Sequence, residues 1–300
     1  MLSIEQSQLS MKPSRLESLL LLYGRHFPIQ RGKLRLINAL WRTTVAKRGT
    51  QRLATLKHGG LKMLCDLSEL LQRQFYFFGT YLVEEQILKC WEKEAKRAKV
   101  FFDVGANVGI YSLVALSVQR DATVHAFEPT AQIASRLRQN AALNELHQLH
   151  VHQVAVSSSN GHAVLRRLRG SSRDNGGMNF ISHDDSHPAA ERVVTVSLDS
   201  FCEDNRIDHI DLLKIDIQGH EHKALTGAAR LLRTARIGMV FFELNWGPDD
   251  EGWCPATESI RILETAGYHF AKPSKRLHWQ KSGEWMHSLS DVVARRVDTQ

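Results

Sequence analysis

Carboxylates follow short apolar runs at several points of this 300-residue chain, where strands of a parallel sheet would end. Asp103 and Glu128 end two such runs, and Asp216 and Glu243 end two later ones. In an open parallel sheet the ligand lies at the carboxyl ends of the strands. We therefore expect Asp216 and Glu243 to converge on one site, where they can accept a proton or hold a cation.

The first of these acids lies in the stretch VFFDVGANVGIYSLVAL, residues 100–116. Its pattern predicts a strand that ends at Asp103, a turn that contains Gly105 and Gly109, and then a helix. Glycines leave the turn open to a ligand, and the helix N-terminus adds unpaired N–H groups. The stretch predicts a ligand-binding turn.

The spacing of the glycines argues against a dinucleotide. Laid on Gly105, the fingerprint G-x-G-x-x-G requires glycine where the chain has Asn107 and Ile110. The pyrophosphate of NAD needs those close approaches, so NAD is disfavoured. S-adenosylmethionine has no phosphate, and its sulfonium and amino group suit an acid such as Asp103.

The second acid supports a nucleoside at the same site. Glu128 ends the strand-like run HAFEP, nineteen residues after Gly109. A carboxylate at this strand end can accept hydrogen bonds from both ribose hydroxyls. That role is common to NAD and adenosylmethionine enzymes, so Glu128 indicates a nucleoside without choosing between the two.

Five segments together resemble the FkbM-type methyltransferases of the class I adenosylmethionine fold, over roughly residues 79–295. The segments are VFFDVGANVGIYS, HAFEP, VAVSSSNG, VSLDSF and IDLLKIDIQGHEHKALTGA. The resemblance implies O-methylation of a hydroxyl, often on a sugar or a natural product. The family usually carries K-I-D-x-E-G, where this chain has Gln218 in place of the glutamate. The predicted cofactor residues are Asp103, Gly105, Asn107, Gly109, Glu128 and Ala155.

The run DLLKIDIQG holds the predicted catalytic residues. Side chains alternate along a strand, so Lys214 and Asp216 share a face, and a buried lysine needs a carboxylate partner. A hydroxyl is a weak nucleophile and needs a base or a metal to take its proton. The predicted catalytic residues are Asp216, Lys214, Glu243 and His220.

Two metal sites come into question. Asp216, Glu243 and Asn245 offer oxygen ligands that suit Mg²⁺, as an alternative to a side-chain base. The sequence His220-Glu221-His222 is a weaker candidate, because residues i and i+2 do not share a helix face and H-E-x-x-H is absent. We retain His220 alone, since it begins the helix after Gly219 and can face the site.

The elements that position these residues alternate between strand and helix patterns after residue 99. This alternation predicts an α/β fold with a Rossmann-like, doubly wound, mostly parallel sheet of seven strands. We expect residues 81–300 to form the methyltransferase domain and residues 1–80 a basic extension. The expected elements are helices over 13–24, 31–46 and 82–98, a hairpin around Gly59-Gly60, a strand over 149–156, an edge strand over 192–198, and a loop over 171–180 that can cover the substrate.

The basic charge lies in the first third of the chain. Residues 1–99 hold 18 Lys and Arg against 8 Asp and Glu, and nine cations without an acid lie between Gly24 and Lys57. The helix there carries an apolar stripe of Leu34, Ile37, Trp41 and Val45. We expect this stripe to pack against the catalytic domain and the cations to face outward. The expected partner of residues 25–57 is an anionic acceptor, or an anionic lipid or membrane surface.

Other classes fit less well. A nucleic-acid methyltransferase would use the basic extension, but KIDIQG has no aromatic clamp for a flipped base and no cysteine nucleophile lies at these strand ends. A binding relic of the fold is the remaining alternative. No apolar run is long enough to span a membrane, and no signal-peptide pattern is present. The four cysteines show no paired spacing, which indicates free thiols in a reducing compartment. We therefore expect a cytoplasmic protein.

Overall fold

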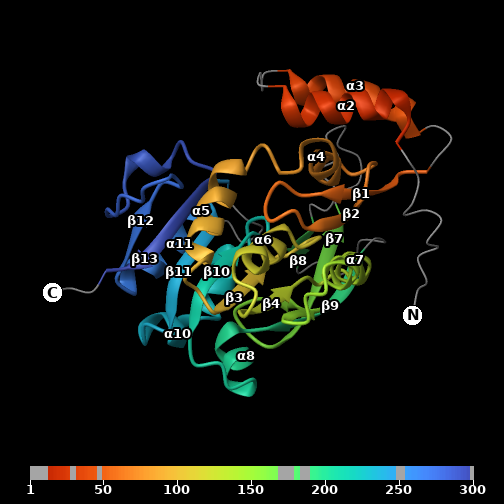
Figure 1. Ribbon diagram of the computed structural model, residues 1–300. Helices are drawn as coiled ribbons and strands as arrows, with labels where there is room; N and C mark the ends of the chain where they lie inside the picture. Colours follow the sequence, from red (N-terminus) through yellow and green to blue (C-terminus); the bar gives the residue numbers. More distant parts are fainter. Residues whose placement is uncertain are drawn as a thin grey trace. The chain divides into compact units, whose positions relative to one another are not determined.

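The structure is a computed structural model that describes residues 13–27, 32–45, 49–167, 179–182, 190–247 and 254–297 (Figure 1). The chain divides into two compact units, with Glu85 as the last residue of the N-terminal one. Most of the predicted covering loop, residues 171–178, lies outside the described residues. No helix of the described residues is both long enough and apolar enough to cross a membrane.

The N-terminal unit combines helices with the predicted hairpin. Strands β1 and β2 pair in antiparallel register around Gly59-Gly60. A third helix, α4, was not predicted, although it buries Phe75, Phe77 and Phe78. The elements are α2 (Arg15–His26), α3 (Lys33–Val45), β1 (Gln51–Thr55), β2 (Lys62–Asp66) and α4 (Leu70–Phe78).

The predicted ends of the first helix were wrong. Ser14 is the N-cap, and its side chain and that of Glu17 bond each other's backbone N–H groups. This capping box fixes the start of α2 one residue after Ser14, so Pro13 lies outside the helix. Gly24 lies within α2 rather than after it. A Cβ there would come 2.5 Å from the carbonyl oxygen of Phe77, so the glycine lets α2 pack closely against α4.

The basic segment of this unit is only partly exposed. As predicted, Ile37 and Trp41 are buried, and Arg35 and Arg42 are exposed. Lys33, by contrast, is 2% exposed, and its ammonium donates to the carbonyl oxygen of Gly24. The prediction that the cations face outward was therefore wrong for Lys33, because a main-chain carbonyl at the end of α2 needs a donor.

Arg52 is the second buried cation of the segment. Its Nε lies 2.6 Å from Oε1 of Glu17, and both side chains are less than 5% exposed. The hydroxyl of Tyr76 donates to the same carboxylate oxygen at 2.6 Å. The pKa of Tyr76 is raised by burial and by this hydrogen bond. One ion pair thus joins α2, β1 and α4.

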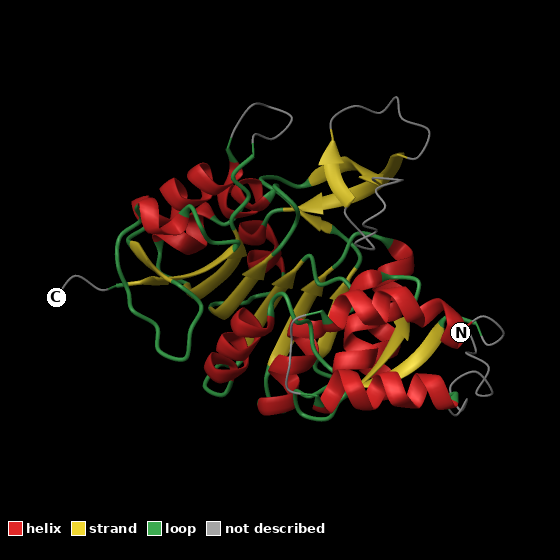
Figure 2. Cartoon of the chain, turned by 90° about the horizontal axis from the view of Figure 1, so that it is seen from above, coloured by secondary structure: helices red, strands yellow, loops and turns green. Residues whose placement is uncertain are grey.

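The second unit contains the predicted sheet of seven strands, which confirms the fold class (Figure 2). Its order is β12-β13-β11-β10-β3-β4-β5, and β13 alone runs antiparallel to its two neighbours in this sheet. The order reverses between β3 and β10, which is the switch point where ligands of such sheets bind. The strands are β3 (Val100–Val104), β4 (Thr123–Phe127), β5 (Leu149–His152), β10 (Ile210–Ile215), β11 (Ile237–Glu243), β12 (Tyr268–Ala271) and β13 (Asp291–Arg296).

Helices cover both faces of this sheet. Trp91 of α5 packs against Phe101 and Phe241 on one face and against Tyr111 of α6. On the other face, Phe201 of α8 packs against strand residues, and α9 to α11 complete a continuous core. The helices are α5 (Glu85–Ala95), α6 (Ile110–Val118), α7 (Ala131–Leu143), α8 (Leu198–Asp204), α9 (Glu221–Thr226), α10 (Ala229–Arg233) and α11 (Pro255–Thr265).

A four-stranded sheet inserted between β5 and β10 was not predicted. The expected strand over 149–156 breaks at residues 153–154, because β5 and β6 belong to different sheets. The expected edge strand over 192–198 is β9, which lies between β6 and β7 in the inserted sheet rather than in the main one. The strands are β6 (Ala155–Val156), β7 (Gly161–Arg167), β8 (Asn179–Ser182) and β9 (Ala190–Val196).

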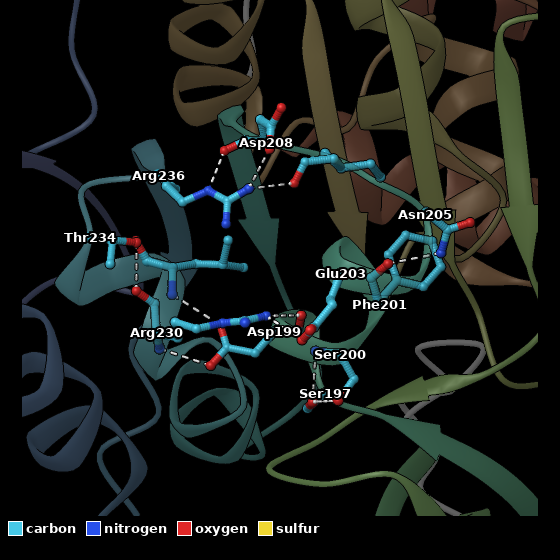
Figure 3. Close-up of polar contacts among 12 residues, drawn as sticks. Ser197, Asp199, Ser200, Phe201, Glu203, Asn205, Asp208, Arg230, Thr234 and Arg236 are labelled. Carbon is cyan, nitrogen blue, oxygen red and sulfur yellow. Dashed lines mark hydrogen bonds and ion pairs between the residues drawn. The ribbon is translucent and has the colours of Figure 1, made fainter.

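The segment VSLDSF after β9 has a structural role (Figure 3). Ser197 caps α8 by accepting from the N–H of Ser200. The carboxylate of Asp199 accepts from the N–H groups of Arg230 and Leu231, which begin α10. The two helices on this face of the sheet are therefore joined by side chains that satisfy their free N–H groups.

The buried ion pair of the N-terminal unit gives a stability prediction. Arg52→Ala leaves the carboxylate of Glu17 buried without its cation, which typically costs about 3–5 kcal/mol. We expect a loss of that order in the free energy of unfolding, measured by urea denaturation followed by circular dichroism. The control is Arg35→Ala, which removes an exposed cation of the same unit. Equal stability of the two variants would contradict a stabilising role for the pair.

Candidate active site

The register of three neighbouring strands brings the predicted residues to one edge of the sheet. Lys214 on β10 is paired with Asp103 on β3 and with Phe241 on β11. Paired residues of parallel strands point to the same face, and so do residues two positions further along. Asp216 and Glu243 therefore follow Lys214 and Phe241 on that face, as predicted.

The backbone N–H groups of the turn after β3 all have hydrogen-bond acceptors within the protein. Gly105 and Ala106 both donate to the carbonyl oxygen of Phe127, at 3.0 Å each. The N–H of Asn107 donates to Glu128, that of Val108 to the side chain of Asn107, and that of Gly109 to Ala106. Five successive N–H groups thus have acceptors inside the protein. A pyrophosphate needs such groups free, which agrees with the prediction against NAD.

The structure gives a different reason for the two glycines than an open approach to a ligand. Both have positive φ, 76° at Gly105 and 94° at Gly109. A Cβ on Gly105 would lie 2.0 Å from the carbonyl oxygen of Asp216, and one on Gly109 would lie 2.1 Å from Leu137. The glycines therefore let the turn pack against the end of β10 and against α7.

Asp103 lies beneath the turn. It is 1% exposed, and its Oδ2 accepts from the N–H and the hydroxyl of Ser112 on α6, at 3.0 and 2.6 Å. Burial raises the pKa of Asp103 to about 6, against the hydrogen bonds from Ser112 and the charge of Lys214. Direct binding of the cofactor by this carboxylate stays a prediction, and the contacts show that it orders the start of α6.

Glu128 lies at the end of β4 and faces the same turn. Its two carboxylate oxygens accept from the N–H of Asn107 at 3.2 Å and of Thr130 at 2.9 Å. The side chain is 6% exposed, and burial raises its pKa. Two backbone donors hold the carboxylate in one orientation and leave acceptor capacity for a ligand hydroxyl. Its role in ribose binding stays a prediction.

Ala155 and Ser157 lie in the segment VAVSSSNG, residues 154–161. Ala155 is 4% exposed and packs in the core of the inserted sheet, so its methyl group offers nothing to a ligand and only its main chain can. Ser157, which was not predicted, lies 3.1 Å from the Nε2 of His220 through its hydroxyl. Gly227 lets the main chain of Ser157 approach closely, because a Cβ there would come 2.1 Å from the carbonyl oxygen of Ser157.

Lys214 is fully enclosed. It is 1% exposed, its ammonium lies 3.4 Å from Oδ2 of Asp216, and it stands 4.8 Å over the ring of Tyr111. The predicted ion pair with Asp216 is therefore present. A buried ammonium is tolerated because a carboxylate and an aromatic face replace its water.

A third carboxylate, which the sequence analysis set aside, joins the two predicted ones. Asp216, Glu221 and Glu243 each place an oxygen within 4.8 Å of the others. Glu221 is fully buried, and its Oε1 accepts from the N–H groups of Ile217 and Gly219. Its Oε2 has no hydrogen-bond partner among the described residues. The acid between the two histidines, rather than either histidine, belongs to the cluster.

The remaining predicted residues lie around this cluster. His220 is the N-cap residue of α9 and contacts Ser157, and its catalytic role stays a prediction. Asn245 accepts from the N–H of Gly247 and lies against Gly219. The indole of Trp246 donates to the carbonyl oxygen of Leu289, and its ring packs against His287.

Comparison with known proteins identifies the family. The methyltransferase FkbM domain matches residues 103–270, which is more than half of the chain. The chain belongs to the FkbM methyltransferase family. The match runs from Asp103 to Phe270 and so includes Glu128, Asp216 and Glu243.

Relatives within the FkbM family are distant. Hexuronic acid methyltransferase AglP from Haloferax volcanii is 24% identical over 174 residues, which cover 55% of this chain and 64% of that protein. The 2-O-methyltransferase NoeI from Sinorhizobium fredii is 26% identical over 192 residues, or 60% of this chain and 76% of that protein. The chain thus spans less than two thirds of the first relative.

Solved structures resemble the chain weakly. A SAM-dependent methyltransferase from Agrobacterium tumefaciens has a TM-score of 0.45 at 10% identity, over 84% of this chain and 71% of that one. A SAM-dependent O-methyltransferase from Thermotoga maritima has a TM-score of 0.40 at 13% identity, over 74% and 67%. Membership in the FkbM family rests on the domain match.

Gln218 is where this chain departs from the FkbM pattern. Its amide nitrogen donates to Asp216 at 3.0 Å and to Glu243 at 3.2 Å. The residue has a φ of 56°, which costs a non-glycine residue about 1 kcal/mol or more. A neutral donor thus lies between two acids where a glutamate would add a further negative charge.

The crowding of acids shifts their proton affinities. Burial, reinforced by the charges of Asp216 and Glu221, raises the pKa of Glu243 to about 8, against the opposing charge of Lys214. Burial also raises the pKa of Glu221 to about 7, although backbone N–H groups favour its charged form. Glu243 therefore holds a proton at pH 7 while no cation other than Lys214 is present.

These shifts predict how stability depends on pH. Below pH 4.5 Glu243 is protonated in the folded and the unfolded chain, and its contribution to stability is complete. Between pH 4.5 and about 8 the folded chain alone keeps the proton, so that contribution is lost as the pH rises. Glu243→Gln imitates the protonated form. We expect the variant to exceed the wild type in stability by on the order of 1 kcal/mol at pH 9, and by less at pH 5.

Urea denaturation at both pH values, in the presence of EDTA, measures this difference. Glu203→Gln is the control, because that carboxylate is two-thirds exposed. A gap between wild type and Glu243→Gln that does not grow with pH would show that Glu243 is ionised at neutral pH.

Proposed function

We propose that this protein is an S-adenosylmethionine-dependent O-methyltransferase that acts on a hydroxyl of a sugar or glycan, with residues 81–300 as the methyltransferase domain. One observation carries the proposal: the linked carboxylates Asp216 and Glu243 lie beside the turn at Gly105, in a chain of the FkbM family. That arrangement sets proton acceptors next to a turn suited to a nucleoside without phosphate. Two distant relatives are a hexuronic acid methyltransferase and a 2-O-methyltransferase, which supports a sugar hydroxyl as acceptor.

The cofactor is proposed to lie over the turn that follows β3. Glu128, already oriented by two backbone donors, would accept hydrogen bonds from the ribose hydroxyls. Asn107 and Gly109 shape the turn through their positive φ values, and Asp103 supports it from below. The acidic edge formed by Asp216 and Glu243 favours the cationic sulfonium end of the cofactor.

Methyl transfer needs a proton acceptor at the reacting hydroxyl. The hydroxyl oxygen forms a bond to the methyl carbon while the carbon–sulfur bond breaks, and its electron pair remains on sulfur as a neutral thioether. The hydroxyl proton passes to the carboxylate of Asp216, which Gln218 links to Glu243. Lys214 holds Asp216 in place through their ion pair. His220, bonded to Ser157, is the alternative acceptor.

A divalent cation is the second means of activating the hydroxyl. Asp216, Glu221 and Glu243 supply the oxygen ligands that Mg²⁺ prefers, and the buried Oε2 of Glu221 has no other partner among the described residues. These residues fit the ion. The predicted ligands were Asp216, Glu243 and Asn245, and Glu221 replaces Asn245 in the observed cluster. A bound Mg²⁺ would lower the pKa of a hydroxyl beside it.

The acceptor and its partners complete the proposal. Residues 25–57 keep Arg35 and Arg42 exposed, so an anionic acceptor, or an anionic lipid near it, remains the expected partner of the N-terminal unit. All four cysteines are free thiols, in agreement with the expected cytoplasmic location.

Cofactor binding can be measured directly. Glu128→Ala removes the proposed acceptor of the ribose hydroxyls, and loss of a charge-assisted hydrogen bond costs about 1.5–3 kcal/mol. We expect adenosylmethionine to bind the variant about ten- to a hundredfold more weakly than the wild type in calorimetric titrations. Glu203→Ala, on the exposed side of α8, should bind as the wild type does. Equal binding by Glu128→Ala would remove this residue from the cofactor site.

Turnover tests the proposed base. Asp216→Asn keeps the size of the side chain and removes its proton affinity, so we expect a loss of about 10²–10⁴-fold in methyl transfer to a panel of hexoses and hexuronic acids. Asp204→Asn, at an exposed carboxylate on α8, is the control. The assay follows transfer of labelled methyl from adenosylmethionine.

The same assay separates a carboxylate base from a metal. Activity that EDTA abolishes and Mg²⁺ restores would assign the cluster as a metal site. Activity unaffected by EDTA would assign the proton to a side chain. Full activity of Asp216→Asn would exclude both roles for Asp216.

A further inference from the structure

A second candidate binding site lies away from the carboxylates, in the same unit of the chain. It is a pocket of about 380 Å³ whose lining includes Lys93, Lys96, Arg97, Arg295 and Trp279. We call it the basic pocket. Met239, the third residue of β11, also lines it, whereas Glu243 ends that strand four residues later. At about 3.3 Å per residue, the basic pocket lies roughly 13 Å along the strand from the proposed site of methyl transfer.

The charge of the basic pocket comes from two separate parts of the chain. Lys93, Lys96 and Arg97 have the spacing i, i+3 and i+4, which puts their side chains on one side of α5 and the turn after it. Arg295 joins them from β13. Glu94, which pairs with Lys93 at 3.1 Å, is the acid in this lining, so cations outnumber acids by four to one.

An aromatic side chain is held in place beside these cations. The guanidinium of Arg295 lies 4.7 Å from the ring centre of Trp279. The next residue, Gln280, exchanges two backbone hydrogen bonds with Phe270 of β12, at 2.7 and 2.9 Å. The position of the tryptophan is thus fixed by the sheet, and it exists before any ligand binds.

Helix stability accounts for only part of this arrangement. Lys93 lies in the last turn of α5, where a cation interacts favourably with the helix dipole. The helix dipole does not explain why Arg295 of β13 and Trp279 lie beside these cations. Like charges this close repel one another, and Glu94 pairs with Lys93 alone, so a further anion would make the convergence of the other cations with Arg295 more favourable.

We propose that the basic pocket binds a phosphate-bearing ligand, with the phosphate among Lys96, Arg97 and Arg295 and a flat or apolar portion against Trp279. Arginine guanidinium groups match phosphate oxygens in pairs, and lysine adds a point charge. The volume lies in the range of small-molecule sites. Because the basic pocket is remote from the carboxylates, such a ligand anchors or regulates the protein and does not receive the methyl group. This inference is independent of the proposed function.

Calorimetric titration tests it with three probes: pyrophosphate, ADP, and phosphatidylcholine vesicles with or without one fifth phosphatidylglycerol. The measurements use the full chain in 50 mM salt, without adenosylmethionine or acceptor. The variant is Lys96→Ala/Arg97→Ala, which removes two exposed cations of the basic pocket. The control is Arg120→Ala/Arg192→Ala, which removes two exposed cations elsewhere in the same unit.

We expect saturable binding of at least one probe by the wild type, a loss of at least tenfold in Lys96→Ala/Arg97→Ala, and no loss in the control. Preference for ADP or pyrophosphate would identify a soluble ligand, and preference for the anionic vesicles a lipid headgroup. Trp279→Ala should weaken ADP more than pyrophosphate if the ligand is soluble. Absence of binding to all probes, or an equal loss in the variant and the control, would overturn the inference.

Discussion

A single buried ammonium makes the acidic edge of this sheet possible. Lys214 is 1% exposed, lies 3.4 Å from Asp216, and contributes a favourable charge to Asp103, Glu243 and Asp291. Carboxylates withdrawn from water repel one another, and without a central cation they would take up protons or separate. The lysine in turn depends on those acids, since a lone buried ammonium is equally unfavourable.

Because the cation and the acids depend on one another, the residues around them have both a structural role and a role in the proposed chemistry. Gln218 bridges two acids as a neutral donor, and Glu221 holds the loop from Ile217 to Gly219 through backbone hydrogen bonds. Each residue that shapes the loop after β10 also contacts the proposed reaction site. A change in one of them alters the position and the charge of its neighbours together.

Much of the sheet and two of the three carboxylates of the acidic cluster were predictable from the sequence, because a strand has a period of two. Alternation placed Lys214 with Asp216, and the ends of apolar runs placed Glu243 beside them. Glu221 was missed because it follows the strand, on the first turn of a helix, where that period no longer applies. The available signal was an acid two residues after the glycine that ends KIDIQG.

Other features depend on contacts that no local pattern records. The glycines of the turn were expected to admit a ligand, yet they admit the main chain of Asp216 and the side chain of Leu137. The excess of basic residues in the first third of the chain predicted a basic extension. Three of those residues, Lys93, Lys96 and Arg97, instead line a pocket with Arg295 of the last strand. Lys33 and Arg52 were expected at the surface and are buried, Lys33 against the carbonyl of Gly24 and Arg52 against the distant Glu17.

The pairing of β6 with β9 has a consequence for how this protein can be rebuilt. Ala155 lies beside Thr195, and the N–H of Ser157 donates to the carbonyl of Val196, so the chain enters and leaves the inserted sheet at one place. A segment whose two ends are adjacent is exchangeable without moving its host. Chimeras joined within these two strands would transfer the insert between relatives as a module and leave the main sheet and its acidic edge unchanged.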